Sequence, residues 1–371
     1  MGIKRSRGNS QRRATRRWAW LFMGPVVIAF IIGFVWPFIQ GIYLSFCKFK
    51  LVSNAQFVGV SNYGEALADA GFQYSFWYTA ATAVVSLVLI NVIAFAVAYA
   101  LTQGIRGSNL FRTVFFMPNL IGGIVLGYIW SMIFDGILQA YQTSILLDTT
   151  YGFWGLIILM CWQQIGYMMI IYIAGLQAVP EDMMEAAKID GATKAQTLFK
   201  VIIPNVMPSI TICTFLSLTN GFKLFDQNLA LTGGQPFNTT EMMALNIYNR
   251  CGWSWRRAGQ GGHLLRARRR TRPRPARIHP QEGGAAVMAA NNKDLASDRT
   301  QKMVLSVLLA IVCIIWVLPV VAVIINSFKL NTYVKTDTFS LPNEESFAGL
   351  QNFVTGMTFG NYPFWKAVGY S

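Results

Sequence analysis

The side chains that commonly carry out catalysis or bind metals are few in this chain and are not grouped. Its five cysteines form no Cys-x-x-Cys pair, and both histidines, His263 and His279, fall in one Arg-rich stretch. This spacing indicates neither a metal site nor a disulfide framework. The phosphate-binding loop Gly-x-x-x-x-Gly-Lys-Ser/Thr does not occur, so we expect no ATP site and no other cofactor on this chain.

Charged residues are almost missing from the long apolar runs, with one exception. Lys223 and Asp226 lie near the end of such a run, three residues apart, and this spacing puts two side chains on one face of a helix. Two interpretations stay open. The residues form an ion pair at a membrane surface, or they line or gate a pathway through the membrane.

The polar loop at 175–204 has the pattern helix, break, helix. Pro180 suits the first position of a helix, and the two acids that follow it favour the positive end of the helix dipole. Gly191 suits the end of that helix. A second short helix is then predicted up to Ile203, and Pro204 is expected to begin the next long apolar helix.

Two alanines stand in the first of these short helices. Glu185 is followed by Ala186 and Ala187, and small side chains at a surface let a partner approach closely. Alanine is also simply the best helix former, so the pair alone does not decide between docking and plain helix formation.

The elements that position these residues follow from composition. The chain is 54% hydrophobic and 13% charged, whereas a soluble domain is about 25% charged. Apolar segments of about 20 residues predict membrane-spanning helices. We find them at 18–46, 76–102, 111–134, 152–175, 205–232 and 303–325. The predicted fold class is therefore all-α, a polytopic transmembrane helix bundle, and the apolar bulk argues against nucleic-acid binding despite the net charge of +15.

The distribution of basic residues orients these helices. Residues 1–17 carry seven basic residues and no acid, which places the N-terminus in the cytoplasm. The apolar run that follows is too long for a signal peptide, so we expect it to be retained as the first helix. The acidic loop 135–151 is then outside. The loop 176–204, with three lysines, is cytoplasmic.

The cytoplasmic loop has a specific resemblance. Glu185-Ala186-Ala187, with Gly191 six residues after the glutamate and Pro204 at the far end, resembles the EAA loop of binding-protein-dependent ABC importer permeases. The form with Asp190 before the glycine resembles the carbohydrate-uptake branch, of maltose or glycerol-phosphate type. Further motifs in matching order also resemble the family: Phe57-Val-Gly-Val-Ser-Asn62-Tyr63, Phe115-Phe-Met-Pro118, Gly127-x-x-Trp130 and Thr232-Gly-Gly-Gln-Pro236.

The resemblance implies a transmembrane permease that moves a sugar or related solute across the cytoplasmic (inner) membrane of a prokaryote. It implies that the chain is not an enzyme and that ATP is hydrolysed on a separate ATPase subunit. The other implied partners are a second permease in a heterodimer, an extracytoplasmic solute-binding protein and the lipid bilayer. The implied ATPase-coupling residues are Glu185, Ala186, Ala187, Asp190, Gly191 and Pro204.

Two other functions were weighed. An ion-coupled secondary carrier would show inverted repeats and charges at mid-membrane, and the sequence lacks both. A membrane-bound enzyme or insertion factor, a non-transport protein, would need a catalytic cluster or an amphipathic groove within the membrane, which the sequence does not show.

After Arg250 the family pattern is lost. Residues 251–287 hold nine arginines and one acid, a net +8 of the chain's +15, where such permeases have a sixth helix. A disordered linker and a phosphate-binding arm are two interpretations. We favour a third, a frameshift. From Trp253, codons shifted by one base permit Gly-Leu-Gly-Val-Gly-Gln-Ala-Lys and an aliphatic run, then a basic tail and a stop codon overlapping that of Met288.

Met288 then resembles a new start. A polar leader, an apolar helix at 303–325 and the motif Gly349-Leu-Gln-Asn352-Phe353 are similar to the opening of a second permease. The predicted domains are therefore a cytoplasmic basic N-terminus (1–17), a five-helix permease core (18–250), an out-of-frame or disordered Arg-rich segment (251–287), and an N-terminal fragment of a second permease with one transmembrane helix (288–371).

Overall fold

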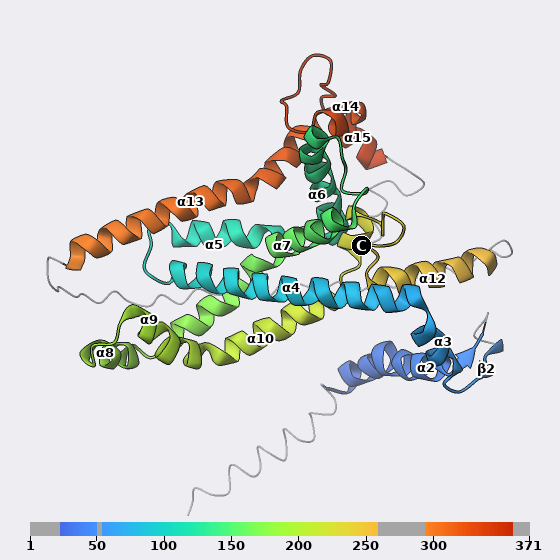
Figure 1. The fold of residues 1–371 in the computed structure, drawn as a ribbon, viewed down its shortest axis with the longest axis horizontal. Helices are drawn as coiled ribbons and strands as arrows, with labels where there is room; N and C mark the ends of the chain where they lie inside the picture. Colours follow the sequence, from blue (N-terminus) through green and yellow to red (C-terminus); the bar gives the residue numbers. More distant parts are fainter. Residues whose placement is uncertain (1–22, 50–53, 259–293, 359–371) are drawn as a thin grey trace, which may run out of the picture. The chain divides into compact units, whose positions relative to one another are not determined.

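The computed structural model describes residues 23–49, 54–258 and 294–358, which divide between two units (Figure 1). Unit 1 comprises Met1–Gln73 with Gly252–Gly261, and unit 2 comprises Tyr74–Cys251 with Gly262–Ser371. The basic N-terminus at 1–17 and the greater part of the Arg-rich segment 251–287 lie outside the described residues. The predictions for these two segments are therefore untested.

Within the described residues, six helices are long and apolar enough to span a membrane, as the sequence predicts. They are Met23–Ser45, Ala70–Leu101, Gly123–Tyr141, Thr149–Gln177, Lys194–Phe222 and Thr300–Ser327. The predicted bundle of membrane helices is confirmed in its helix content and in the location of the six segments.

Unit 1 consists of the first span and the short elements that follow it. The span contains a π-helical turn, η1 (Ile31–Val35), before α2 (Trp36–Ser45). The π turn precedes Pro37, which has no N–H to continue the ordinary hydrogen-bond pattern. None of the 18 most apolar consecutive residues of this span is buried. The rings of Phe30, Phe34 and Phe38 stack along one side of it.

An asparagine closes the end of this span. Three short elements follow it: β1 (Cys47–Lys48), β2 (Gln56–Phe57) and α3 (Ser61–Ala68). Cys47 pairs with Phe57 in an antiparallel register. Asn62 donates from Nδ2 to the carbonyl oxygens of Ser45 and Cys47, each at 3.0 Å. We call this arrangement the first asparagine clamp.

Unit 2 is built around α7. Its long helices are α4 (Ala70–Leu101, whose first residues belong to unit 1), α7 (Thr149–Gln177), α10 (Ile203–Phe222) and α13 (Asp294–Ser327). Of the 18 most apolar consecutive residues of α7, 67% are buried, whereas the same share in α4 is 33%. The helix α7 is therefore the central one. Tyr172 donates from its hydroxyl to Asn91 Oδ1 at 2.6 Å, and Asn91 donates to Ser217 Oγ at 3.2 Å. These bonds join α7, α4 and α10.

The third predicted segment, 111–134, is not one helix. It is divided into α5 (Ser108–Phe116), the 3-10 turn η3 (Met117–Leu120), and α6 (Gly123–Leu138), which continues into η4 (Gln139–Tyr141). Pro118 and the glycines at 122 and 123 interrupt the helix, and the candidate span begins only at Gly123. The end of α5 lies directly on α7: a Cβ on Gly166 would be 1.9 Å from the carbonyl oxygen of Phe115.

The fifth predicted segment, 205–232, also differs from the structure. The elements of this region are α8 (Glu181–Ile189), α9 (Lys194–Thr197), the π-helical η5 (Leu198–Ile202), α10, α11 (Asp226–Leu231) and α12 (Met243–Ala258). The spanning helix starts earlier than predicted, at Lys194, and ends earlier, at Phe222. Residues 223–225 separate it from α11.

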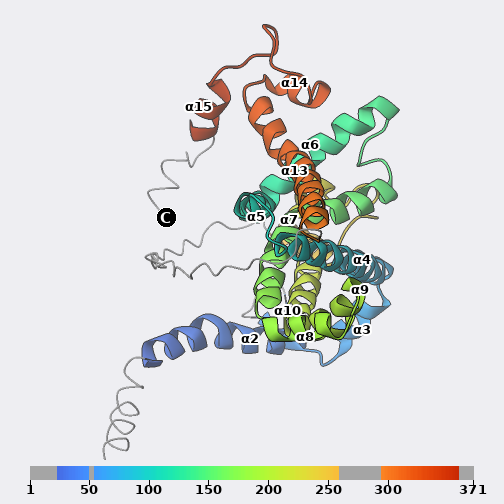
Figure 2. The same cartoon turned by 90° about the vertical axis from the view of Figure 1, so that its left-hand side faces the viewer.

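The predicted helix at 303–325 lies within α13, which packs against α5 and α6. Trp162 on α7 donates from Nε1 to the carbonyl oxygen of Trp316 at 2.9 Å, and the ring of Phe115 meets that of Trp316 at 5.0 Å. Beyond α13 come α14 (Asn331–Thr336) and α15 (Gln351–Thr358), as Figure 2 shows.

A second asparagine clamp closes α13. Asn352 donates from Nδ2 to the carbonyl oxygens of Ser327 and Lys329, at 2.9 and 2.6 Å. Lys329 forms an antiparallel bridge with Phe347. In both clamps the asparagine donates to two carbonyl oxygens two residues apart at the end of a span. In both, the second of these two residues also pairs with a phenylalanine in an antiparallel bridge.

Candidate functional site

The loop predicted as helix, break, helix contains α8. Pro180 is its N-cap rather than its first helical residue, and Glu181 and Asp182 occupy the first turn. Lys188 lies in the last turn, so charges at both ends oppose the helix dipole. An isolated helix of nine residues is marginal in water, so α8 depends on its packing against η5 in addition to these terminal charges.

Gly191 ends α8 in a Schellman motif. Its φ is +73°, a conformation that glycine adopts without steric cost. The Gly191 N–H donates to the Lys188 carbonyl at 3.1 Å, and the Ala192 N–H donates to the Ala187 carbonyl at 2.9 Å. The prediction that Gly191 terminates the helix is therefore confirmed as a backbone feature.

The structure brings most of the predicted coupling residues to one short surface. Glu185, Ala186, Asp190 and Gly191 are exposed on or just after α8. Ala187 differs, because it is 8% exposed and α8 packs against η5. The small side chain of Ala187 lets α8 pack against its own chain, and a docking role for either alanine stays a prediction.

Three large apolar side chains on this loop were missed by sequence reasoning. Ile189 is 85% exposed, Phe199 is 67% exposed and Met183 is 43% exposed. Exposed apolar side chains among charged ones are a feature of protein-binding surfaces. The sequence did contain a signal for them. Single apolar residues lie between acids and lysines in a segment too polar to enter the membrane, and this pattern predicts exposed apolar side chains.

The second half of the loop is continuous with the fifth span. Thr193 and Gln196 form a capping box that starts α9, and the helix runs through η5 into α10 without a break. The π turn lies just before Pro204, which cannot donate to the carbonyl of Lys200. Pro204 therefore lies inside a continuous helix instead of separating two.

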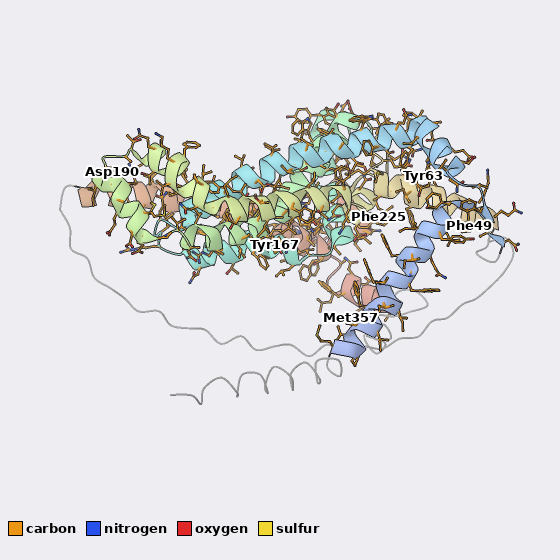
Figure 3. The ribbon with its side chains drawn as sticks, turned by 90° about the horizontal axis from the view of Figure 1, so that it is seen from below. Phe49, Tyr63, Tyr167, Asp190, Phe225 and Met357 are labelled. Carbon is orange, nitrogen blue, oxygen red and sulfur yellow. The ribbon has the colours of Figure 1, made fainter. Side chains whose placement is uncertain are left out.

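The loop lies at the end of unit 2 where α13 begins. Lys194 donates from Nζ to Gln301 Oε1 at 3.1 Å. Figure 3 labels Asp190 at this end, with Tyr167 midway along the unit. The start of α13 is therefore on the same side as the loop that carries Glu185.

Lys223 and Asp226 do not share a helix face. Lys223 is the C-cap of α10 and Asp226 is the first residue of α11, so the chain turns between them. Both are exposed, and the ion pair found within the described ranges is Lys48–Glu65, at 3.5 Å in unit 1. The expected geometry of an ion pair along one helix is therefore wrong. A pathway role for either residue stays a prediction.

Amide side chains lie near these two charges. Gln227 donates to Gln163 Oε1 at 2.8 Å, and Asn220 donates to Gln164 Oε1 at 3.2 Å. An amide side chain both donates and accepts hydrogen bonds, and these two pairs join α7 to α11 and to the end of α10. Within the described ranges no three His, Cys, Asp or Glu side chains are placed to hold a metal ion.

The chain is similar to known transport proteins. Residues 92–254 match the family model described as "Binding-protein-dependent transport system inner membrane component". The chain is 44% identical, over 62% of its length and 82% of the relative, to the "Probable starch degradation products transport system permease protein AmyD" of Thermoanaerobacterium thermosulfurigenes. It is 32% identical, over 62% of its length and 83% of the relative, to the "Multiple sugar-binding transport system permease protein MsmF" of Streptococcus mutans.

A solved structure has the same fold. It is described as the crystal structure of a bacterial ABC transporter involved in the import of the acidic polysaccharide alginate. The match has a TM-score of 0.56 and 17% sequence identity, and it covers 67% of this chain and 89% of the other. The helical arrangement of the described residues is thus one that a transporter subunit adopts.

Proposed function

This chain belongs to the family of binding-protein-dependent transport system inner membrane components, and from this premise we propose that it conducts a sugar or oligosaccharide into the cell. It is a multi-pass inner membrane protein and the permease component of a bacterial ABC importer. In such systems ATP is hydrolysed on a separate subunit, and an extracytoplasmic binding protein delivers the solute.

Two observations support a carbohydrate cargo. The relatives above are described as transporting starch degradation products and as a multiple sugar-binding system. The pairs Gln163–Gln227 and Gln164–Asn220 offer donors and acceptors at the level where α10 ends, which suits a solute rich in hydroxyl groups.

The function also requires a site through which the ATPase acts, and we assign it to α8 with the helix that follows. Glu185, Ala186, Asp190 and Gly191 present a polar surface, and Ile189 is its most exposed apolar side chain. Because α9, η5 and α10 are continuous and α8 packs against η5, a push on α8 would act on the helix that forms the fifth span. This continuity is the observation that best supports a coupling role.

Substitution of Ile189 by Asp tests this assignment. Burial of one large aliphatic side chain in a partner contributes about 1.5–3 kcal/mol, which corresponds to a roughly tenfold to hundredfold change in affinity. We expect Ile189→Asp to lower solute-stimulated ATPase activity and uptake by at least about tenfold in the assembled importer made from an intact-frame gene.

Leu147→Asp is the matched control, because Leu147 is 67% exposed and lies in the loop 142–148 expected on the opposite side of the membrane. It should leave both rates within about twofold of the parent. Equal activity of the Ile189 variant and the parent would show that this face does not dock.

A heterodimer with a second permease is part of the proposal, together with the origin of residues 288–371 as the opening of such a permease. The support is the repeated asparagine clamp: each clamp closes a candidate span and is followed by a short helix. A frameshift between the two permease genes would join them as observed. Sequencing of the DNA across codons 245–290 tests this, and an uninterrupted frame without an alternative apolar reading would refute it.

A further inference from the structure

The two asparagine clamps carry the same exposed apolar surface. The motif Phe-x-Gly-x-x-Asn-aromatic occurs as Phe57 to Tyr63 and again as Phe347 to Phe353. Its glycines have φ values of +60° and +56°, and the aromatic ring that follows the asparagine packs on Phe46 in the first copy and on Phe328 in the second. The two copies therefore have one backbone arrangement.

Each clamp asparagine lies in the first turn of a helix of eight residues with an exposed apolar stripe. The stripe of α3 is formed by its N-cap Val60 with Tyr63 and Leu67, which are 70%, 44% and 66% exposed. The stripe of α15 is formed by Leu350, which directly precedes the helix, with Phe353, Val354 and Met357, and these are 66%, 42%, 59% and 39% exposed. Figure 3 labels one residue of each stripe, Tyr63 and Met357.

The stripes occupy equivalent positions. Counted from the clamp asparagine, both include positions −2, +1 and +5, which lie on one side of a helix. The opposite side is polar in both copies, with Glu65 on α3 and Thr355 on α15 at the same position. A surface that recurs with the same spacing, on helices held in the same way, points to one kind of occupant.

We propose that α3 and α15 are interfacial helices whose apolar stripes insert into the lipid headgroup region of the extracytoplasmic leaflet. The argument is continuity with the bilayer contact of the spans. Asn62 ties the first turn of α3 to the carbonyl groups where the first span ends, and α4 begins two residues after α3. Asn352 ties α15 in the same way to the end of α13.

A clamped helix cannot leave the level at which its span leaves the membrane. Short amphipathic helices at this level place their apolar side about 5–10 Å into the boundary between headgroups and acyl chains. The clamp thereby sets the depth of each span in the membrane and its rotation about its own axis. The asparagine fixes the short helix to the end of the span, and the stripe holds that short helix in the membrane interface.

The test is a depth measurement on the full chain in phosphatidylcholine vesicles. Single cysteines replace Leu67 and Met357 in the stripes, and Glu65 and Thr355 serve as matched controls on the opposite side of the same helices. Each is labelled with an environment-sensitive thiol fluorophore, then quenched by a lipid spin-labelled near the headgroup or by aqueous iodide. Labelling of the unsubstituted chain, in which Cys47, Cys213 and Cys313 are buried, sets the background.

We expect probes at Leu67 and Met357 to be quenched by the spin-labelled lipid at least twice as strongly as those at Glu65 and Thr355, and iodide to show the reverse order. If iodide reaches the stripe positions as readily as the controls, the helices stand in water and the proposal is overturned. The same conclusion follows if the stripes become protected only when the binding protein is added, since they would then be a protein-binding surface.

Discussion

Replacement of Gly191 by Ala, with a matched control, would separate the proposed coupling function of α8 from simple backbone strain. Gly191 has φ +73°, and no heavy atom lies within 4 Å of an added Cβ. The cost of a side chain is therefore purely conformational. Gly104 offers a matched control, because it too has φ +73° with nothing within 4 Å, but it lies in a different loop.

The magnitude follows from the left-handed conformation. Holding alanine there costs about 1–2 kcal/mol relative to glycine. The strain is relieved if the substituted residue leaves this conformation, which breaks the bonds from the N–H groups of residues 191 and 192 to Lys188 and Ala187. A cost of about 1–2 kcal/mol lowers the ratio of α8 with its native end to α8 without it by a factor of about 5–30.

The assay is solute-stimulated ATP hydrolysis and uptake by the assembled importer in vesicles, made from an intact-frame gene. We expect Gly191→Ala to lower both rates, by at most about 5- to 30-fold. Gly104→Ala, which carries the same strain, should change them less than about twofold, and both variants should be inserted at parent levels. Equal losses in the two variants would refute the reasoning, because strain anywhere would then explain the effect.

Two further predictions concern the helix packing and the direction of α13. Gly166→Ala should prevent stable folding, because its Cβ would lie 1.9 Å from the Phe115 carbonyl oxygen. Gly64→Ala, where no atom lies within 4 Å of the added Cβ, should be tolerated. The yield of detergent-stable protein measures both effects. A cysteine at Gln301 should react with a membrane-impermeant maleimide only from the cytoplasmic side, because Lys194 of the loop contacts Gln301. Labelling from outside would show that α13 has the opposite orientation.

The spans and their order could be predicted from sequence, because apolar length is a local property. Each predicted segment overlaps a candidate span. The errors lie at prolines and glycines. Pro118 separates α5 from α6, whereas Pro204 lies within a helix that continues through a π turn. A proline removes one hydrogen bond in either case, and only the neighbouring packing decides whether the helix ends.

The candidate site was predicted in part. The turn at Gly191 follows from its own residue type and neighbours, so the sequence sufficed. The burial of Ala187 did not follow, because η5, which α8 packs against, comes later in the chain. The separation of Lys223 from Asp226 was missed for a similar reason: a helix end at Phe222 depends on the contacts of α11 with α6.

The membrane setting, the expected cytoplasmic side of the loop at Glu185 and the recurrence of the clamp motif all follow from residue order, because hydropathy and charge need no partner. The folded arrangement was needed to show that the second half of the loop forms one continuous helix with the fifth span. It was needed also to show that Asn62 and Asn352 make equivalent pairs of hydrogen bonds, to carbonyl groups 15 to 25 residues away. Such bonds and close contacts join segments distant in the chain, and a local pattern does not encode them.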